Sequence, residues 1–549
     1  MRFRWLPSVA LLCYLALPAL AQTAPKAKDV DKATKADSPG LIVRIRSIDG
    51  VLGDFKYLAK VIGKEDKAEE IEKFVLSAAG KDGLSGFDTK RPIGLYGTVG
   101  PAVVDSTAVA LIPIADEKAA LGLLERLNFK AEKDDDDVYS VMPEGSRVPI
   151  YFRFANKYAY VTAQNKGSID KDKLLDPATV FPAGDTSLLT ILGHIDQIPK
   201  GLRQAFISQL ELKIEEAKNE KKGADTPAQK ELQTQVLEEA RKLMTSLTND
   251  GGPVEIRIDL DRKTEELSLE VSLAGAPKTE LAESIKKLAE PKSVFGGLVG
   301  KNSAANGALH VILPESIRKA MEPVLDEVVK KSIEKETDKA KREQAEKALP
   351  VVMPSLKAGE LDAAFDLRGP SEDKTYTAVA GIKVKDGAEL DKLLRKTVAD
   401  LPEADKKKLT LDADKAGSVA IHEVIITNEL DAEGKAIFGE KAKAYLAIRS
   451  DAILVTLGGN ALSTLKEAVA SPVQAGKTFS FEMSMARVAP FMEKENPGAT
   501  KAAEEAFGKN KDGDKVRITL EGGDKVKLRA SMKAQVIKFI ALVDEAKKK

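Results

Sequence analysis

The amino-acid sequence predicts an α+β fold: a tandem duplication of two halves, each with antiparallel sheets covered by helices and built from ferredoxin-like β-α-β-β-α units. Three observations predict it. Strand-like runs alternate apolar and charged residues, helical patterns follow pairs of these runs, and the same segments recur in the same order in both halves of the chain. Together they indicate one ancestral unit that has been copied and fused.

The strand pattern is clearest in residues 254–275. Ile256 and Ile258 alternate with charged residues, and a matching run follows a charged turn. Because successive side chains of a strand point to opposite sides, this pattern predicts a sheet with one apolar face. Leu281 and Ile285 follow at helical spacing. A lone hairpin is only marginally stable in water, so we expect this helix to cover the sheet.

The two halves repeat each other in separate segments. The stretch "VALIPIADEKAALGLLERL" matches "VAGIKVKDGAELDKLLRKT", a strand leading into a helix that opens at Asp116 in one copy and at Asp386 in the other. Both Asp residues are N-cap candidates, because a short side-chain oxygen can accept from free N–H groups of the first helical turn. Matching segments begin at Val109 and Val379, Tyr151 and Tyr445, Ala183 and Ala475, and Val254 and Val516, at separations of 270, 294, 292 and 262 residues. Preserved order with drifting offsets is typical of duplicated halves with loop insertions.

Each half also divides into two smaller units. A strand followed by a helix, and then by strand, turn, strand and helix, is expected four times along the chain. The first strands follow Gly40, Thr186, Gly307 and Thr478, and the second pairs begin near Ile93, Val254, Leu361 and Val516. Extra strands are expected near Val138, Ile150 and Tyr158, with partners in the second half.

Long helical patterns interrupt both halves. Residues 199–247 predict two long helices, and residues 314–348 predict one more, whose C-terminal part is almost wholly charged. We expect solvated helices held by Glu/Lys pairs four residues apart, with partner contacts as the alternative. The predicted organisation is a signal peptide (1–21), a flexible leader (22–40), unit A (41–180) and unit B with the long helical pair (181–295) of the first half, and unit A (305–470) and unit B (471–549) of the second half.

The N-terminus predicts export. Arg2 and Arg4 precede an apolar run from Trp5, which ends in a small-residue cleavage pattern at Ala21. A lipid anchor at Cys13 is the disfavoured alternative, because no small residue precedes that position and it lies inside the apolar run. No later stretch approaches the roughly 18 to 20 apolar residues of a transmembrane helix. We therefore expect a periplasmic or secreted protein with no transmembrane span after signal cleavage.

Composition excludes several kinds of partner. Cleavage after Ala21 removes the single Cys and the single Trp, so we expect no disulfide. It also removes Arg2 and Arg4, leaving 83 basic against 85 acidic residues and a net charge near −2. No global field then favours nucleic acid, and we predict no nucleic-acid partner. Aromatic residues make up only 5%, which is low for a surface that binds carbohydrate or peptide by stacking.

Histidines and other candidate site residues show no catalytic or metal-binding spacing. His194, His310 and His422 each lack a second His at ligand spacing, so we expect structural or surface histidines and no metal site. Residues 134–137 are four consecutive Asp residues, which we interpret as a solvated turn because adjacent side chains point different ways. Residues 510–521 approach a calcium-loop count with Gly at the wrong position.

Two short motifs are also rejected. In "SPVQAGKT", Ser471 stands where a phosphate loop needs its first Gly, and the motif leads into a strand instead of a helix. In "GLSGF", Ser85 lacks the spacing of a nucleophile elbow. The sequence therefore predicts no cofactor.

The signal peptide, the absence of other cysteines and the doubled segments from Val109 and Val379 resemble large exported bacterial proteins of unassigned function. That resemblance implies no activity and no site residues. Because the framework is repeated and no polar constellation is, we expect a non-enzymatic scaffold or binding protein of the cell envelope or extracellular space, whose partner is an envelope or extracellular protein or ligand. The alternative is an exported hydrolase with a site in the cleft between halves, where His194 and Asp196 are the most plausible acid/base pair.

Overall fold

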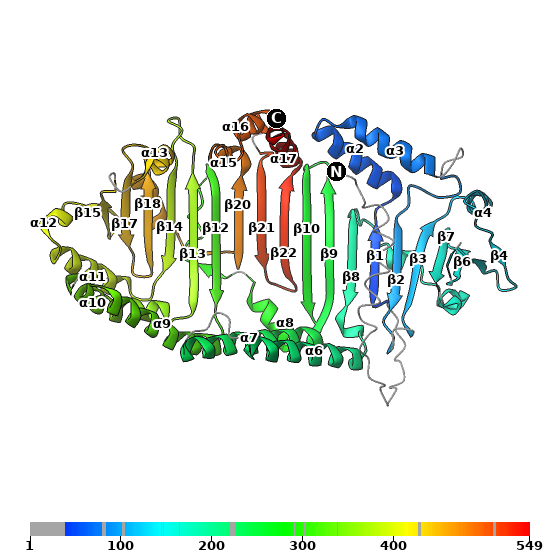
Figure 1. The fold of residues 1–549 in the computed structure, drawn as a ribbon, viewed down its shortest axis with the longest axis horizontal. Coiled ribbons are helices and arrows are strands. Elements are labelled where there is room, and N and C mark those ends of the chain that lie inside the picture. The colour runs from blue at the N-terminus through cyan, green and yellow to red at the C-terminus, as the bar shows by residue number, and fades with distance from the viewer. Residues whose placement is uncertain are drawn as a thin grey trace. The chain divides into compact units, whose positions relative to one another are not determined.

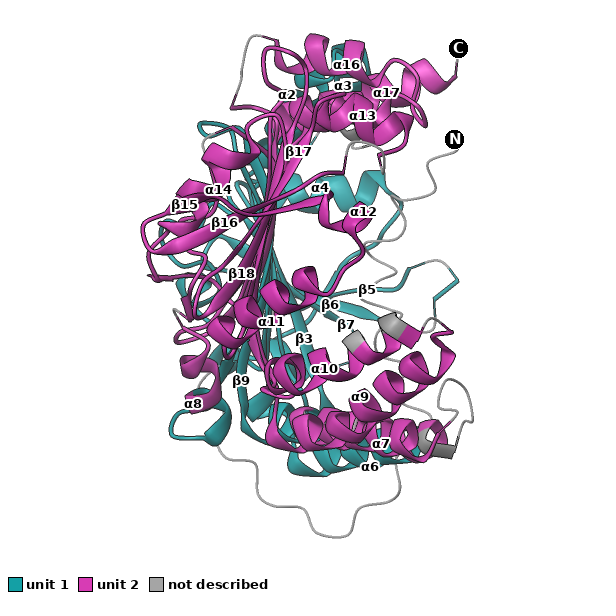
Figure 2. Ribbon diagram, turned by 90° about the vertical axis from the view of Figure 1, so that its left-hand side faces the viewer, with its two compact units in different colours: residues 1–213, 244–282 teal, residues 214–243, 283–549 magenta. Residues whose placement is uncertain are grey.

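The computed structural model of the protein describes residues 39–78, 84–101, 105–143, 145–146, 148–163, 165–219, 226–289, 291–300, 302–337, 339–426, 430–508 and 512–548. These residues form two compact units. Unit 1 lies within Met1–Lys213 and Met244–Ala282, and unit 2 lies within Ile214–Leu243 and Glu283–Lys549 (Figure 2). Both units combine helices with antiparallel strands, which confirms the α+β class. The predicted signal peptide, residues 1–21, lies outside the described residues, as does most of the leader.

The strands of unit 1 form an antiparallel sheet in the order β10-β9-β8-β1-β2-β3-β7-β6-β5-β4 (Figure 1). The strands are β1 (Leu41–Ile45), β2 (Ile93–Thr98), β3 (Thr107–Pro113), β4 (Glu132–Lys133), β5 (Tyr139–Val141), β6 (Ile150–Ala155), β7 (Tyr158–Ala163), β8 (Leu189–His194), β9 (Gly251–Asp261) and β10 (Glu266–Gly275). The helices are α2 (Ile48–Val61), α3 (Glu65–Ala78), α4 (Glu117–Arg126), η3 (Lys166–Ile169), η4 (Lys171–Lys173), α5 (Pro177–Val180) and η5 (Ile195–Gln197). Helices α6 (Lys200–Asn219), α7 (Pro227–Asp250) and α8 (Glu280–Lys287) contain residues of both units.

The strands of unit 2 form an antiparallel sheet in the order β22-β21-β20-β12-β13-β14-β18-β17-β16-β15. They are β12 (Ser303–Ile312), β13 (Glu360–Arg368), β14 (Thr377–Lys383), β15 (Leu409–Ala416), β16 (Val419–Val424), β17 (Lys443–Ile448), β18 (Ala452–Gly458), β20 (Phe479–Ser484), β21 (Lys515–Glu521) and β22 (Val526–Lys533), and a separate pair joins β11 (Lys292–Ser293) to β19 (Gln474–Ala475). The helices are α9 (Glu315–Lys335), α10 (Lys339–Leu356), α11 (Gly387–Ala399), α12 (Glu403–Lys406), α13 (Ala432–Phe438), α14 (Ala461–Val469), α15 (Met485–Met492), α16 (Ala499–Phe507) and α17 (Ala534–Lys547).

When the strands of each unit are numbered by their order along the chain, both sheets have the same spatial strand order. The first strand of each lies beside the second, and a helix pair joins them: α2 and α3 between β1 and β2, α9 and α10 between β12 and β13. These first two strands are direct antiparallel neighbours. A ferredoxin-like unit instead links parallel strands through its first helix. The ferredoxin-like label is therefore not confirmed.

Local sequence signals place several of these elements. Asp116 accepts a hydrogen bond from the N–H of Ala119 at 2.7 Å, and Asp386 accepts one from Glu389 at 3.1 Å, so both expected N-caps are confirmed. The β6–β7 turn has φ of 51° at Asn156 and 63° at Lys157. Positive φ at both central residues gives a turn whose twist matches that of the flanking strands.

Residues 314–348 do not form the single long helix that the sequence predicts. Helix α9 ends at Lys335 and α10 begins at Lys339. The segment around this break is almost wholly charged and has no apolar stripe to hold one straight helix against a core. Among the described residues, no helix has the length and apolar character needed to cross a membrane.

Each sheet has one face that is covered by other parts of its unit, which we name the covered face. In unit 1 this face carries Ile42, Tyr96 and Leu111, and Ile169 and Val180 from the segment after β7 pack on it with no exposure. In unit 2 the covered face carries Ala364, Val379 and Leu454, under Phe295, Leu298 and helix α14. These clusters are the cores that position the sites described next.

Candidate functional site

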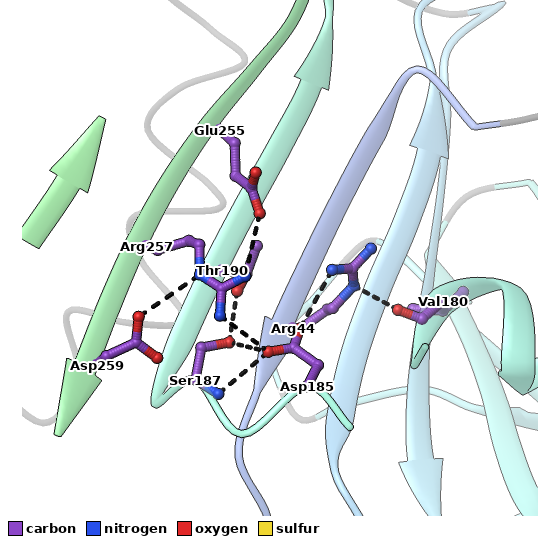
Figure 3. Close-up of polar contacts among 8 residues, drawn as sticks. All are labelled: Arg44, Val180, Asp185, Ser187, Thr190, Glu255, Arg257 and Asp259. Carbon is purple, nitrogen blue, oxygen red and sulfur yellow. Dashed lines mark hydrogen bonds and ion pairs between the residues drawn. The ribbon is translucent and has the colours of Figure 1, made fainter. Parts of the chain in front are cut away.

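A cluster of charged and hydroxyl side chains lies on the covered face of unit 1, where β1, β8 and β9 are neighbours (Figure 3). Thr190 lies directly between Arg44 and Arg257 in the strand register. Asp185, in the loop before β8, lies beside both arginines, with its Oδ2 3.2 Å from Arg44 Nη1 and its Oδ1 3.4 Å from Arg257 Nη2. Ser187 donates its hydroxyl to Asp185 at 2.6 Å.

Every charge in this cluster has an opposite partner. Arg257 also lies 3.7 Å from Glu255 and 3.5 Å from Asp259, and Arg44 donates from Nε to the carbonyl of Val180 at 2.5 Å. A charge-compensated network of this kind ties the loop before β8 to β1 and β9. Because the Ser187 hydroxyl donates to a carboxylate and no His accompanies it in the cluster, we interpret the cluster as structural and not as a nucleophilic site.

Acid should weaken unit 1 through Asp185. Burial of Asp185 favours the neutral acid, but the hydrogen bonds from Ser187 and the charges of Arg257 and Arg44 outweigh it, so the pKa of Asp185 lies below its usual 3.8. A carboxyl with a lowered folded-state pKa contributes stability that is present above the unfolded-state pKa of about 3.9 and is lost as pH falls through the folded-state value. We expect the urea midpoint of the wild type to fall more steeply below about pH 4 than that of Asp185→Asn. Parallel curves for the two proteins would contradict this role.

His422 joins helix α11 to the β15–β16 hairpin in unit 2. Its side chain has no exposure, and the N–H of Asp412 donates to Nδ1 at 3.1 Å. The ring proton is therefore assigned to Nε2, which lies 3.1 Å from Asp391 Oδ1. Arg395 holds both carboxylates, at 2.7 Å from Asp391 and 2.7 Å from Asp412. The imidazole is enclosed and both of its nitrogens are engaged, which is typical of a structural histidine.

The other two histidines lie near strand ends. His194 ends β8 and Asp196 lies in η5, and the separation of His194 Nδ1 from Asp196 Oδ1 is 3.7 Å. That is longer than a hydrogen bond, so the acid/base role of this pair stays a prediction. His310 Nε2 lies 3.1 Å from Glu360, whose carboxylate also binds Lys383 at 2.6 Å.

The acidic run at residues 134–137 forms a turn before β5. Asp134 accepts from the N–H groups of Asp136 and Val138, and Asp137 lies 2.9 Å from Lys133 and 3.2 Å from Lys171. These carboxylates are engaged by backbone amides and lysines. Over the part of the chain that the structure describes, no group of His, Cys, Asp and Glu is arranged to hold a metal ion.

Opposite the covered face, each sheet has a second face that we name the apolar face. In unit 2 the register aligns Phe365, Ala380 and Val455 in one row and Ala363, Ile382 and Ile453 in the next. Phe365, Ile382 and Val455 are 41%, 43% and 45% exposed. Seven neighbouring strands present only apolar side chains on this face: Phe479, Phe481, Met483, Val516, Ile518, Leu520, Leu528, Ala530, Met532, Ala305, Gly307, Leu309, Val311, Leu361, Ala363, Phe365, Leu367, Ala378, Ala380, Ile382, Ile453, Val455 and Leu457.

The polar residues of these strands lie on the covered face instead. Asp362 and Asp366 are each 1% exposed. Asp362 accepts from the Ser293 hydroxyl at 2.7 Å and the Val294 N–H at 2.9 Å, and Asp366 accepts from the Gly300 N–H at 2.7 Å. They hold the covering segment in place. Burying carboxylates while leaving aliphatic rows in water reverses the usual pattern of a sheet and makes the apolar face the candidate site of unit 2.

Unit 1 carries a similar apolar face on β10, β9, β8, β1 and β2. Leu269 is 44% exposed and Leu41 36% exposed, and the other large side chains of the face are half-buried. The face consists of Leu267, Leu269, Val271, Leu273, Val254, Ile256, Ile258, Leu189, Ile191, Leu41, Val43, Ile45, Ile93 and Leu95, with Leu260 buried at its margin and glycines at 97 and 193.

The expectation that the helix carrying Leu281 and Ile285 covers the 254–275 hairpin is wrong for the apolar face of the hairpin, because Leu269 on that face remains exposed. The hairpin is stabilised instead by pairing in a wide sheet, in which β9 also pairs with β8. Alternation in the sequence identifies the apolar side of each strand. It contains no signal that this side remains uncovered, so the apolar face was not predicted as a site.

Helices stand at the margins of the apolar face within each unit. In unit 2, helices α15–α17 pack on Met483, Val516 and Met532 at one margin of the apolar face. At the opposite margin of the same face, Asp391 of α11 contacts His422 (Figure 2). In unit 1, Ala120 of α4 packs with Ile112 and Val161 of the same face. Helices therefore flank the apolar face in each unit.

Comparison of the chain with models of protein families, with curated proteins and with solved structures finds no match in any of the three.

Proposed function

We propose that this chain is an exported, non-enzymatic binding protein, built as a tandem duplication, whose apolar faces hold the hydrocarbon chains of a lipid. The single observation that carries the ligand class is the row pattern of unit 2, where Phe365, Ile382 and Val455 are exposed in adjoining rows while Asp362 and Asp366 of β13 are buried on the opposite side of the sheet. Export rests on the predicted signal peptide, residues 1–21.

The duplication is supported by topology as well as by sequence. The repeated segments that begin at Val109 and Val379 contain β3 and β14, and those that begin at Val254 and Val516 contain β9 and β21. Each of these strands has corresponding neighbours in its own sheet. A duplicated framework would give each unit its own apolar face and thus its own ligand surface.

Hydrocarbon suits this surface because the surface offers no directional contact. Its strands present no polar side-chain atom, and the backbone groups of the central strands are paired with their neighbours. An extended peptide laid on the face would lose water from its amides without gaining partners, which is costly. An acyl chain has no such groups, and each buried methylene gains about 0.8 kcal/mol.

The uneven surface of the apolar face also favours a flexible hydrocarbon chain over a second β-sheet as its occupant. A Cβ at Gly307 would lie 2.6 Å from the Phe365 ring, so that ring lies over Gly307 beside smaller side chains. Packed sheets need face-to-face approach to about 10 Å. The helices that flank the apolar face stand in the way of such an approach. Linear hydrocarbon can follow the uneven rows between them.

Lipid binding can be tested on the purified mature protein. We expect native mass spectrometry to detect co-purified lipid, and cis-parinaric acid, a fluorescent fatty acid, to bind with saturable fluorescence that long-chain fatty acid displaces. Size-exclusion chromatography with light scattering would be run on the same sample. A dimer with no parinaric acid binding would overturn the proposal in favour of a second copy on the apolar face.

A further inference from the structure

Two of the three guanidinium nitrogens of Arg153, Nε and Nη1, are buried in unit 1 and have no acceptor among the described residues. Arg153 lies on β6 directly opposite Tyr160 of β7, so its side chain is on the covered face. The residue is 4% exposed, and among the described residues its Nε and Nη1 atoms have no hydrogen-bond partner. Arginine stays charged in proteins, so burial cannot be relieved by loss of a proton.

The layer around Arg153 is closed by buried side chains. Tyr160 and Ile169 have no exposure, and Ile169 belongs to η3, which packs on β6 and β7. Burial raises the pKa of Tyr160, and it raises the pKa of Tyr96, in the same cluster, to about 12. The Ser168 hydroxyl of η3 is also buried with no hydrogen-bond partner among the described residues.

The acidic residues above this layer are engaged elsewhere. Asp134 pairs with Lys166, and Asp137 pairs with Lys133 and Lys171. Both carboxylates belong to the turn between β4 and β5 and are exposed, with side-chain exposures of 39% for Asp134 and 57% for Asp137. None of these contacts reaches Arg153.

We propose that Arg153 holds a buried monovalent anion, with chloride as the physiological occupant. An isolated charge in an apolar interior is strongly unfavourable unless it is paired, and buried polar groups without protein partners commonly mark a water or an ion. Arg153 carries a positive charge and supplies only N–H donors, which favours an acceptor of negative charge. The enclosing side chains have almost no exposure, so a compact spherical ion suits the site better than a carboxylate or phosphate ligand.

The test compares anions at constant ionic strength on the full mature chain. We expect the melting temperature of unit 1 to be higher in sodium chloride or bromide than in sodium gluconate, by about 2 to 4 °C when the halide is well above its Kd. Arg153→Met should lose this difference. Arg449→Met is the matched control, because Arg449 has a side chain 13% exposed that is paired with Asp451 in unit 2, and the halide response of unit 1 should persist.

Crystals soaked in bromide give an answer that does not depend on a variant folding. Anomalous density beside Arg153 Nε and Nη1 supports the site. A water only at this position, or equal melting temperatures of the wild type in chloride and gluconate, would overturn the proposal. Neither result bears on lipid binding by the apolar faces, which is measured separately.

Discussion

Asp54→Ala is expected to lower the free energy of unfolding of unit 1 by about 3 kcal/mol. The Asp54 side chain, in α2, is 3% exposed and lies between two arginines. Arg46 Nη1 is 2.5 Å from its Oδ2, and Arg262 Nε is 2.7 Å from its Oδ1. Removing the carboxylate leaves two guanidinium groups facing each other where α2 meets the ends of β1 and β9. Breaking a buried charge network from one side is strongly destabilising, although Arg262, 44% exposed, can turn towards water.

The measurement is urea unfolding followed by far-ultraviolet circular dichroism, since the single Trp of the chain is Trp5, within the predicted signal peptide. Glu70→Gln is the control, because Glu70 is 63% exposed in a surface pair with Lys67 and should change stability by less than about 0.5 kcal/mol. Asp54→Asn keeps the shape and loses the charge, and should fall between the two. If Asp54→Ala and Glu70→Gln unfold with equal free energies, the pairing of Asp54 with the two arginines does not stabilise unit 1.

Local elements followed from the sequence because their causes are local. The N-caps at Asp116 and Asp386 depend on one side chain and the amide three residues on. The strands expected at Val254 and Val516 depend on alternation over a few residues. Strand β9 contains Val254, and strand β21 contains Val516. The expected strand near Val138 begins at Tyr139, one residue later, after the Asp134 turn.

Long-range contacts could not be predicted in this way. Asp54 meets Arg262 across 208 positions of sequence, and Asp362 meets Ser293 across 69. The sequence around Asp54 and around Asp362 predicts an ordinary exposed position for each, because no residue nearby in the sequence indicates that the carboxylate is buried. The same limit explains the apolar face. Alternation assigns Ile258 and Leu269 to one side of a hairpin, but whether that side is covered depends on distant segments.

Val455→Asp is expected to weaken parinaric acid binding at the apolar face of unit 2 by at least about tenfold. Val455 lies on β18 in a row with Ala380 and Phe365, and it is 45% exposed before any ligand binds. The exposed position allows the carboxylate to stay hydrated in the free protein, so the fold should be retained. Ligand binding would bury that charge against hydrocarbon without a partner, which costs more than the roughly 1.4 kcal/mol that corresponds to tenfold in Kd.

Val328→Asp is the matched control for Val455→Asp. Val328 is 50% exposed on helix α9 and does not lie on the sheet, so the same substitution at similar exposure should leave binding unchanged. Because each unit carries an apolar face, Val455→Asp should remove one class of sites and leave binding by unit 1. Ile256→Asp, on β9, should then remove the remaining class. If Val455→Asp and Ile256→Asp each bind parinaric acid as the wild type does, the hydrocarbon lies elsewhere and the apolar faces are not the ligand surface.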